Sequence, residues 1–457
     1  MTFRLIPPRI IPPLDENFRP AILANQAFRQ NATSPLILGL ERNSGEVSNF
    51  ETKIYSTDHP DFEDSFQYVE RIVKFLLWQR GGHTLYVGNS PRVAEHLQKL
   101  YSATGERKFD WDFMGTQVFE QPLKVIACSL DEVPASRETG KLIGRNLQGH
   151  RIGFDLGASD RKVSAVVGGT PIYSEEVIWE PRKNSDPEYH YREIMTALKT
   201  AASKMPQVDA IGGSSAGIYI DNRPMVASLF RGVPRERFGE IKEMFSRIQK
   251  EMNVPLEVIN DGDVTALAGS MSIEDNGILG IALGSSEAAG YVNMEGHIMG
   301  WLNELAFAPI DYSPNAPVEE WSGDLGCGAS YFSQQCVFRL APKAGIQLPA
   351  DVTDAEKLKF VQDKLEAGHE GALKIWQSMG VYLGYGIAHY ADFYEIKHVL
   401  ILGRCTSGRG GDLLIEGARK VFETEFPGLL KKIELHLPDE KIRRVGQSVA
   451  AASLPAI

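Results

Sequence analysis

The chain has 457 residues, of which 43% are hydrophobic and 9% aromatic, enough for two or three domains with cores of their own. Its 48 Lys and Arg residues against 59 Asp and Glu residues give a net charge of −11, which argues against nucleic-acid and anionic-membrane partners. Four cysteines in so long a chain predict reduced thiols in the cytoplasm. Prolines at positions 7, 8, 12, 13 and 20 fit neither a signal peptide nor a membrane helix.

Residues 1–148 are predicted to form an α/β domain of unknown function. Residues 36–55 read as a hairpin that turns at an Asn-Ser-Gly sequence, and its shape suggests a relative of the second hairpin described below. Apolar residues within 66–77 fall on one face of a helix. Residues 84–88 are predicted to form a strand, and residues 123–128 a further, buried strand.

Residues 151–162 read RIGFDLGASDRK and predict two strands joined by a turn of small residues. Such a turn lets backbone N–H groups approach phosphate oxygens, and the residues concerned are Gly157, Ala158 and Ser159. Asp155 is placed to hold Mg²⁺ through water, and Lys162 can add a positive charge beside the phosphates. By itself the segment is equally compatible with an ordinary tight hairpin.

A second acid, Asp261, follows a predicted buried strand at residues 256–260. Phosphoryl transfer to a hydroxyl group needs a carboxylate that takes up the hydroxyl proton, and an acid at the tip of a buried strand is held rigidly for that purpose. The sequence Asn-Asp-Gly-Asp is also well suited to a turn or a helix N-cap, with the following helix expected from Thr265. The local sequence leaves both alternatives open.

Further segments follow in a recognisable order: a strand ending at Gly217, a loop between strands at residues 278–292, Glu304, a strand at 399–403 with a glycine-rich turn before a helix from Asp412, and a closing helix from Gly446. Together with the two acids, this order resembles the ROK family of sugar kinases, in the hexokinase, actin and Hsp70 superfamily. The resemblance covers residues 149–457. It implies α/β architecture with two RNase H-like lobes and a cleft between them, lobe one being 149–262 with the helix at 440–457 and lobe two 263–439.

The resemblance implies phosphorylation of a hexose or related polyol by ATP and Mg²⁺. Asp261 then corresponds to the general base, while Asn260, Glu304 and Gly217 contact the sugar. The residues expected at the nucleotide and its metal ion are Asp155, Gly157, Ala158, Ser159, Lys162, Gly284, Ser285, Ser286, Gly403 and Gly411, with Asp155 holding Mg²⁺ through water. The expected partner is a sugar or polyol, with no nucleic acid and no membrane, and a homodimer is left open.

Several positions depart from the family pattern. Phe307 stands where the family has a histidine, and Ala329 where it has a glutamate, so that two of the usual sugar contacts are lost. The cysteine-rich zinc loop of many relatives is absent, so no zinc site is expected, and Cys327 and Cys336 are predicted to be buried free thiols. In the second phosphate loop Glu287 would repel a triphosphate. The departures favour either a substrate other than glucose or binding without turnover.

Two other functions were weighed against the kinase. Residues 213–217 match the Gly-x-Ser-x-Gly motif of serine hydrolases, but that motif must run straight into a helix, and residues 218–220 are strand-like. The histidines that could supply a base have no supporting context: His297, His369, His389, His398 and His436. The other alternative is a catalytically silent sensor that binds a sugar or a nucleotide. Binding to DNA is not expected, because the N-terminal region reads as α/β rather than as a helix-turn-helix.

Overall fold

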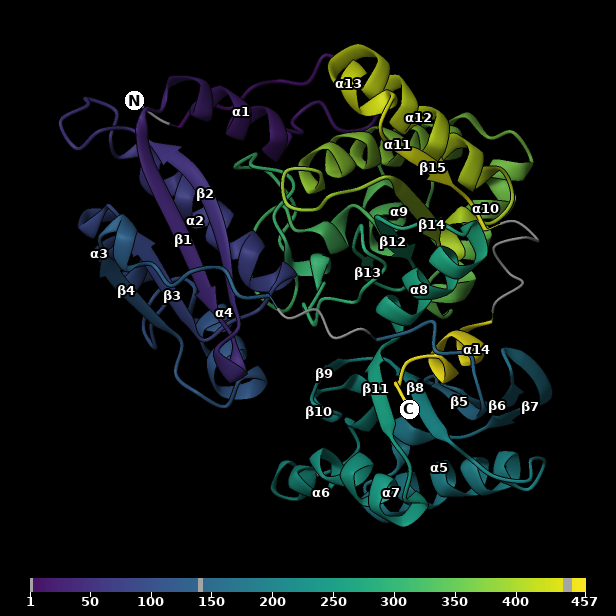
Figure 1. The fold of residues 1–457 in the computed structure, drawn as a ribbon. Helices are drawn as coiled ribbons and strands as arrows, with labels where there is room; N and C mark the ends of the chain where they lie inside the picture. The colour runs from purple at the N-terminus through teal and green to yellow at the C-terminus, as the bar shows by residue number, and fades with distance from the viewer. Residues whose placement is uncertain (1–2, 139–142, 439–445) are drawn as a thin grey trace. The chain divides into compact units, whose positions relative to one another are not determined.

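The computed structural model describes residues 3–138, 143–438 and 446–457, whose elements Figure 1 shows in chain order. The chain forms two compact units. Unit 1 comprises residues 1–139, 281–289 and 301–437, and unit 2 comprises residues 140–280, 290–300 and 438–457. The mixed α/β fold class is confirmed. The domain boundaries expected from the sequence stay a prediction; residues 1–139 belong to the same unit as residues 301–437.

The N-terminal part of unit 1 contains a four-stranded sheet in the order β2-β1-β3-β4. Its strands are β1 (Ser34–Glu41), β2 (Val47–Ile54), β3 (Thr84–Gly88) and β4 (Lys124–Cys128), and its helices include α1 (Ala21–Asn31), α2 (Asp64–Gln79), α3 (Pro91–Leu100) and α4 (Lys108–Asp112). The predicted hairpin is confirmed as β1 and β2. The prediction that β4 is buried was wrong, because it has one neighbour, β3, and lies exposed at the sheet edge.

Helix α2 is buried on all its faces and not on the single apolar face that its sequence indicates. Its charged residues are buried as well, among them Glu70, Arg71 and Lys74. Charged side chains are tolerated in such surroundings only when they are paired. The helix therefore has a second packed face, which the sequence pattern presents as a solvent face.

Unit 2 is built on a five-stranded sheet in the order β11-β8-β5-β6-β7. Its strands are β5 (His150–Leu156), β6 (Asp160–Val167), β7 (Thr170–Ile178), β8 (Ala210–Ser215) and β11 (Leu256–Asn260). Strands β5, β8 and β11 are parallel, so that their carboxyl ends lie at one edge, whereas β6 and β7 are antiparallel. The N-terminal sheet differs from this one, because β3 runs antiparallel to β1 whereas β8 runs parallel to β5, and the kinship suggested for the two hairpins stays a prediction.

Helices cover both faces of this sheet (Figure 1). One face packs against α5 (Pro187–Ala202), α6 (Phe238–Lys242) and α7 (Met244–Met252). The C-terminal helix α14 (Gln447–Ala452) lies on the other face. It approaches closely because Gly153 and Gly212 have no side chain, and a Cβ atom at either would collide with the backbone of α14.

A further four-stranded sheet has the order β13-β12-β14-β15 and carries the later segments of the sequence. Its strands are β12 (Ile278–Leu283), β13 (Glu287–Val292), β14 (His398–Leu402) and β15 (Glu434–His436), and the helices are α9 (Gln334–Leu340), α10 (Asp354–Glu366), α11 (Glu370–Tyr390), α12 (Arg409–Glu425) and α13 (Pro427–Leu430). Helix α12 begins at Arg409, earlier than the predicted Asp412. Among the described residues, no helix is long and apolar enough to span a bilayer.

Candidate functional site

Asp155 lies near the carboxyl end of β5, at the sheet edge where β8 and β11 also end. Ser214 is its register partner on β8 and donates a hydrogen bond of 2.7 Å to Asp155 Oδ1. Lys162, its register partner on β6, is exposed. Burial raises the pKa of Asp155, while the Ser214 hydrogen bond and the charge of Lys162 act to lower it. The carboxyl group is thus held by a serine that sequence analysis did not identify.

The turn after β5 exposes Ala158 and Ser159, as a phosphate-binding turn requires. Its first amide is already engaged, since Gly157 N donates a hydrogen bond of 2.9 Å to Asp160 O. Gly157 O accepts a hydrogen bond of 2.8 Å from Trp179 Nε1, and Ser159 O accepts one of 3.1 Å from the Trp179 amide. The turn therefore has a fixed backbone with its tip open to solvent.

Asp261 is the first residue of α8 (Asp261–Ile273), so this helix starts earlier than the predicted Thr265. The N-cap is Asn260, whose Oδ1 accepts a hydrogen bond of 2.7 Å from Gly262 N and whose Nδ2 donates one of 2.7 Å to Gly217 O. The capping role weighed for Asp261 therefore belongs to Asn260. The same amide group ties the strand end to the turn at Gly217, whose φ of 125° suits a glycine.

The half-buried Asp261 carboxyl is close enough to Asp155 for the two charges to interact. Burial and then the negative charge of Asp155 raise the pKa of Asp261 to about 6. The first turn of α8 is supported from α14, because Gln447 Nε2 donates hydrogen bonds to Thr265 Oγ1 at 2.7 Å and to Asp261 O at 3.3 Å. The outcome is a carboxyl group on a fixed helix turn, with a pKa that suits proton uptake near neutral pH.

Ser215, the serine of the Gly-x-Ser-x-Gly motif, is the last residue of β8. The chain continues into the strand β9 (Ile218–Ile220) and β10 (Arg223–Val226), which confirms that no helix follows directly. Ser215 is fully buried, and its Oγ accepts a hydrogen bond of 2.6 Å from the Tyr219 hydroxyl. This arrangement does not have the form of a nucleophile elbow.

In unit 1, the loop between β12 and β13 exposes Ser285 and Ser286, whereas Gly284 is half-buried. Gly403, with a φ of 93°, is a required glycine, since a Cβ there would collide with the Leu283 backbone at the end of β12. Gly403 therefore lies beside the start of the loop between β12 and β13. Gly411 differs from them: it is buried in the first turn of α12, where the side chain of Leu437 and the carbonyl oxygen of Thr406 surround it.

Glu287 does not face the exposed serines of this loop. It is 4% exposed, and its Oε1 accepts a hydrogen bond of 3.0 Å from the Tyr390 hydroxyl on α11. Its other oxygen, Oε2, occupies the place where a side chain at Gly328 would begin. Burial, with the charge of Glu304 in addition, raises the pKa of Glu287 to about 8, so the group is largely protonated at neutral pH. The expectation that Glu287 repels a triphosphate was therefore wrong, because the side chain is buried against Tyr390 and Gly328 and because it is largely protonated.

Glu304 is held by the end of helix α2. Its backbone N–H donates a hydrogen bond of 2.9 Å to Trp78 O, and the preceding Asn303 N–H donates one of 2.9 Å to Gln79 O. Phe307 stacks on the Trp78 ring, with 4.1 Å between the ring centroids. The phenylalanine in place of the family's histidine thus serves as a contact for the N-terminal region, which sequence analysis left without a role.

A buried ion-pair network fastens the same region to the segment after Glu304. We name it the Lys74 network, and its members are Glu70, Arg71, Lys74, Arg107, Asp110 and Asp324. Lys74 is wholly buried, with Nζ 2.9 Å from Asp110 Oδ1 and 3.3 Å from Asp324 Oδ2. Burial would raise the pKa of Asp324, but the charges of Arg71, Lys74 and Arg107 lower it.

Cys327 and Cys336 are free and buried, as predicted. Burial raises the pKa of Cys327 to about 12 and that of Cys336 to about 11, so both are thiols at neutral pH. Asp324 and Cys327 belong to one segment of the chain. Here the Lys74 network, at Asp324, binds this segment to the N-terminal region.

No family model and no curated protein matches the sequence. Solved structures do match, and one is a ROK hexokinase from Thermus thermophilus, with a TM-score of 0.51 and 16% identity over 66% of this chain and 97% of that chain. The fold is that of ROK proteins. A ROK-family transcriptional regulator, a homologue of the E. coli MLC protein, gives 0.51 at 18% identity over 67% of this chain and 78% of that chain. A putative N-acetylmannosamine kinase from Listeria monocytogenes matches with a TM-score of 0.50 and 14% identity, over 66% of this chain and 97% of that chain.

These identities establish a shared fold and no more. Among the three similar structures, the fold serves sugar kinases and a regulator alike. The activity of the present chain therefore depends on its own residues.

Proposed function

We propose that this protein transfers the γ-phosphoryl group of ATP to a hydroxyl group of a hexose or related polyol. Asp261 acts as the general base that takes the hydroxyl proton while the oxygen attacks phosphorus and ADP leaves. The observation that carries the proposal is the position of Asp261 at the edge where β5, β8 and β11 end, beside Asp155 and with a pKa of about 6. Ligands of open α/β sheets bind outside the carboxyl ends of parallel strands.

The remaining roles are assigned residue by residue. Asn260 fixes the Gly217 turn and is the sugar-binding residue that adjoins the base, and Glu304 supplies carboxylate oxygens for further sugar hydroxyls. Asp155 fits Mg²⁺, since it offers a carboxylate whose orientation Ser214 fixes, beside an exposed turn. When bound, Mg²⁺ would neutralise negative charge on the phosphates.

The nucleotide phosphates are assigned to Lys162 and to the two small-residue loops, with Gly403 beside the second of them. Of the predicted set, Gly411 is the weakest member, because it is buried within α12 and serves helix packing. Neutralisation of Glu287 by burial favours the proposal, since no fixed negative charge then arises from the second loop at neutral pH.

A catalytically silent sensor is the second candidate. Two observations favour it: Phe307 packs on Trp78 and offers no polar contact, and Ala329 has no carboxylate. The similar ROK regulator provides a precedent for the fold. Such a protein would bind a sugar or a nucleotide and would not need the proton transfer to Asp261.

A coupled assay of ADP release with Mg²⁺ and ATP, over hexoses, amino sugars and polyols, separates the two candidates. The kinase proposal predicts sugar-dependent ADP release with at least one of these acceptors, and mass spectrometry should find the phosphorylated product. Calorimetric binding of a sugar without ADP release from any of them would replace the kinase with the sensor. Absence of both binding and release would overturn the sugar site itself.

A further inference from the structure

Two histidines and a glutamate meet at the β15 edge of the sheet β13-β12-β14-β15, outside the residues assigned above. His398 begins β14, and Glu434 and His436 are the first and last residues of β15. The two strands are parallel, and His398 pairs with Glu434 in their register. Residues two apart on a strand project to the same face, so the side chains of Glu434 and His436 lie on one face of β15. The register places His398 beside them on β14.

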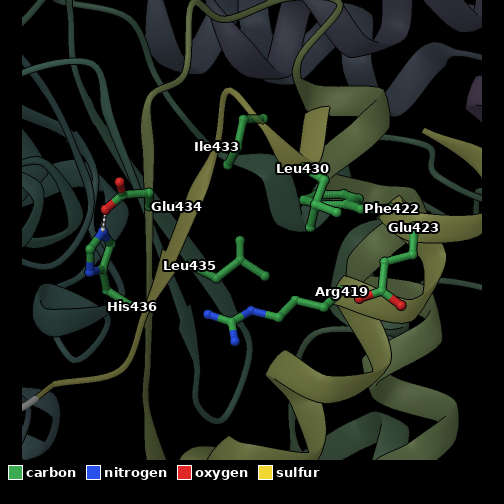
Figure 2. Close-up of a pocket in the computed structure, with 8 residues that line it drawn as sticks. All are labelled: Arg419, Phe422, Glu423, Leu430, Ile433, Glu434, Leu435 and His436. Carbon is green, nitrogen blue, oxygen red and sulfur yellow. Dashed lines mark ion pairs between the residues drawn. The ribbon is translucent and has the colours of Figure 1, made fainter. Parts of the chain in front are cut away.

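Figure 2 shows how strand alternation separates two surfaces of β15. Leu435 lines a hollow of about 540 Å³ together with Arg419 of α12, and Glu434 and His436 border the same hollow while their side chains point away from Leu435 and toward each other. Two of the three cluster residues therefore lie at the margin of this hollow. All three side chains are carried on strand backbones, and His398 is 7% exposed, so its ring has little freedom.

The ligand atoms of the cluster are close together. His398 Nδ1 is 3.0 Å from His436 Nε2, and Glu434 Oε2 is 3.9 Å from the first of these atoms and 3.8 Å from the second. A triangle with these sides has a central point about 2.1 Å from all three corners, which matches metal–nitrogen and metal–oxygen bonds of zinc. A hydrogen bond between the two imidazole rings would explain the 3.0 Å distance. It would not explain why a carboxylate oxygen lies within 4 Å of both nitrogens.

We propose that His398, Glu434 and His436 bind a divalent transition-metal ion, for which Zn²⁺ is the best fit. Two imidazoles and one carboxylate suit zinc, whereas Mg²⁺ prefers oxygen ligands alone. Water completes the coordination on the open side, where the Glu434 side chain is 74% exposed. The ion ties the short strand β15 to β14 and thereby stabilises the sheet next to Gly403.

The test uses the full-length protein, stripped of metal with EDTA and then freed of the chelator. Zinc is titrated in competition with a chromophoric chelator, and thermal unfolding is recorded with and without Zn²⁺. The variants are His436→Gln and Glu434→Gln, both at accessible positions, so that folding is preserved. The control is His150→Gln: His150 Nδ1 lies 3.4 Å from Asp209 Oδ2, a pair of one imidazole and one carboxylate, and the His150 side chain is 26% exposed against 23% for His436.

Wild-type protein and the His150→Gln control should bind one equivalent of Zn²⁺ and gain thermal stability from it. Replacing a residue that only hydrogen-bonds to a metal ligand typically weakens metal binding by roughly 10–100-fold. His436→Gln removes a ligand itself and should weaken zinc binding by more than that, and Glu434→Gln should also weaken it. Millimolar Mg²⁺ should not displace the zinc. Equal affinity in wild type and His436→Gln would overturn the proposal by placing the ion elsewhere, and so would wild-type protein that takes up no stoichiometric zinc.

Discussion

Replacement of Lys74 by methionine tests how firmly the N-terminal region is joined to the rest of unit 1. Methionine preserves most of the side-chain volume but removes the charge that lies 2.9 Å from Asp110 and 3.3 Å from Asp324. Asp324 keeps Arg71 and Arg107 as partners, so the uncompensated charge is mainly that of Asp110. Removing one partner of a buried ion pair costs about 3–5 kcal/mol, because the other charge is left uncompensated. We expect Lys74→Met to lower the free energy of unfolding by that amount.

Urea unfolding followed by tryptophan fluorescence measures the effect, since Trp78 donates a hydrogen bond of 2.6 Å to Asp110 Oδ1 and reports on the network directly. Lys99→Met is the matched control: Lys99 pairs with Glu95 at 2.8 Å, but the side chains are 73% and 64% exposed. A pair of this kind is worth at most about 1 kcal/mol. Adding Asp110→Asn to Lys74→Met should restore much of the loss. Equal, small effects of Lys74→Met and Lys99→Met would refute the reasoning.

Three further predictions concern buried groups near the candidate site. Burial raises the pKa of Glu287 to about 8, so between pH 4.5 and 8 this carboxyl group ionises in the unfolded state but stays protonated in the folded state, and the wild type loses stability. Glu287→Gln lacks this ionisation and should become increasingly more stable than wild type over the same range. A difference in thermal unfolding that does not change with pH would contradict this. Ser214→Ala should cost about 1.5–3 kcal/mol in chemical denaturation, since it removes the hydroxyl that donates to Asp155, and an unchanged midpoint would speak against that bond. Gly328→Ala should cost about 1–3 kcal/mol by overpacking. Gly239→Ala, within helix α6 and with nothing within 4 Å of the new methyl group, should cost nothing, because alanine favours a helix more than glycine does; similar losses in the two variants would refute the close approach of Glu287.

Local sequence patterns predicted the elements that local physics determines. The hairpin of β1 and β2, the strand at residues 84–88 and the strand-turn-strand around Asp155 follow from alternation and turn residues. The order of these elements was sufficient for the ROK resemblance, which the structure confirms at the level of the fold. The predicted site residues stay predictions that the variants described here can test.

What the sequence did not reveal depends on contacts between distant segments. Ser214 reaches Asp155 because β5 and β8 are parallel neighbours, although the residues are 59 positions apart. Lys74 reads as a solvent-exposed helix residue until a second packed face is known. Glu287 is buried by contacts of the same distant kind, with Tyr390 on α11 and with Gly328.

The turnover number of Asp261→Asn, measured with the acceptor found in the ADP-release screen, tests the central claim most directly. Asparagine keeps the shape of the side chain but cannot take up the proton, so kcat should fall by about 10²–10⁴-fold while sugar affinity and thermal unfolding stay unchanged. The wild-type kcat should rise with pH to a plateau above pH 6, as the pKa of about 6 for Asp261 requires. A near-normal kcat in Asp261→Asn, with normal stability, would show that Asp261 is a structural residue and would contradict the account.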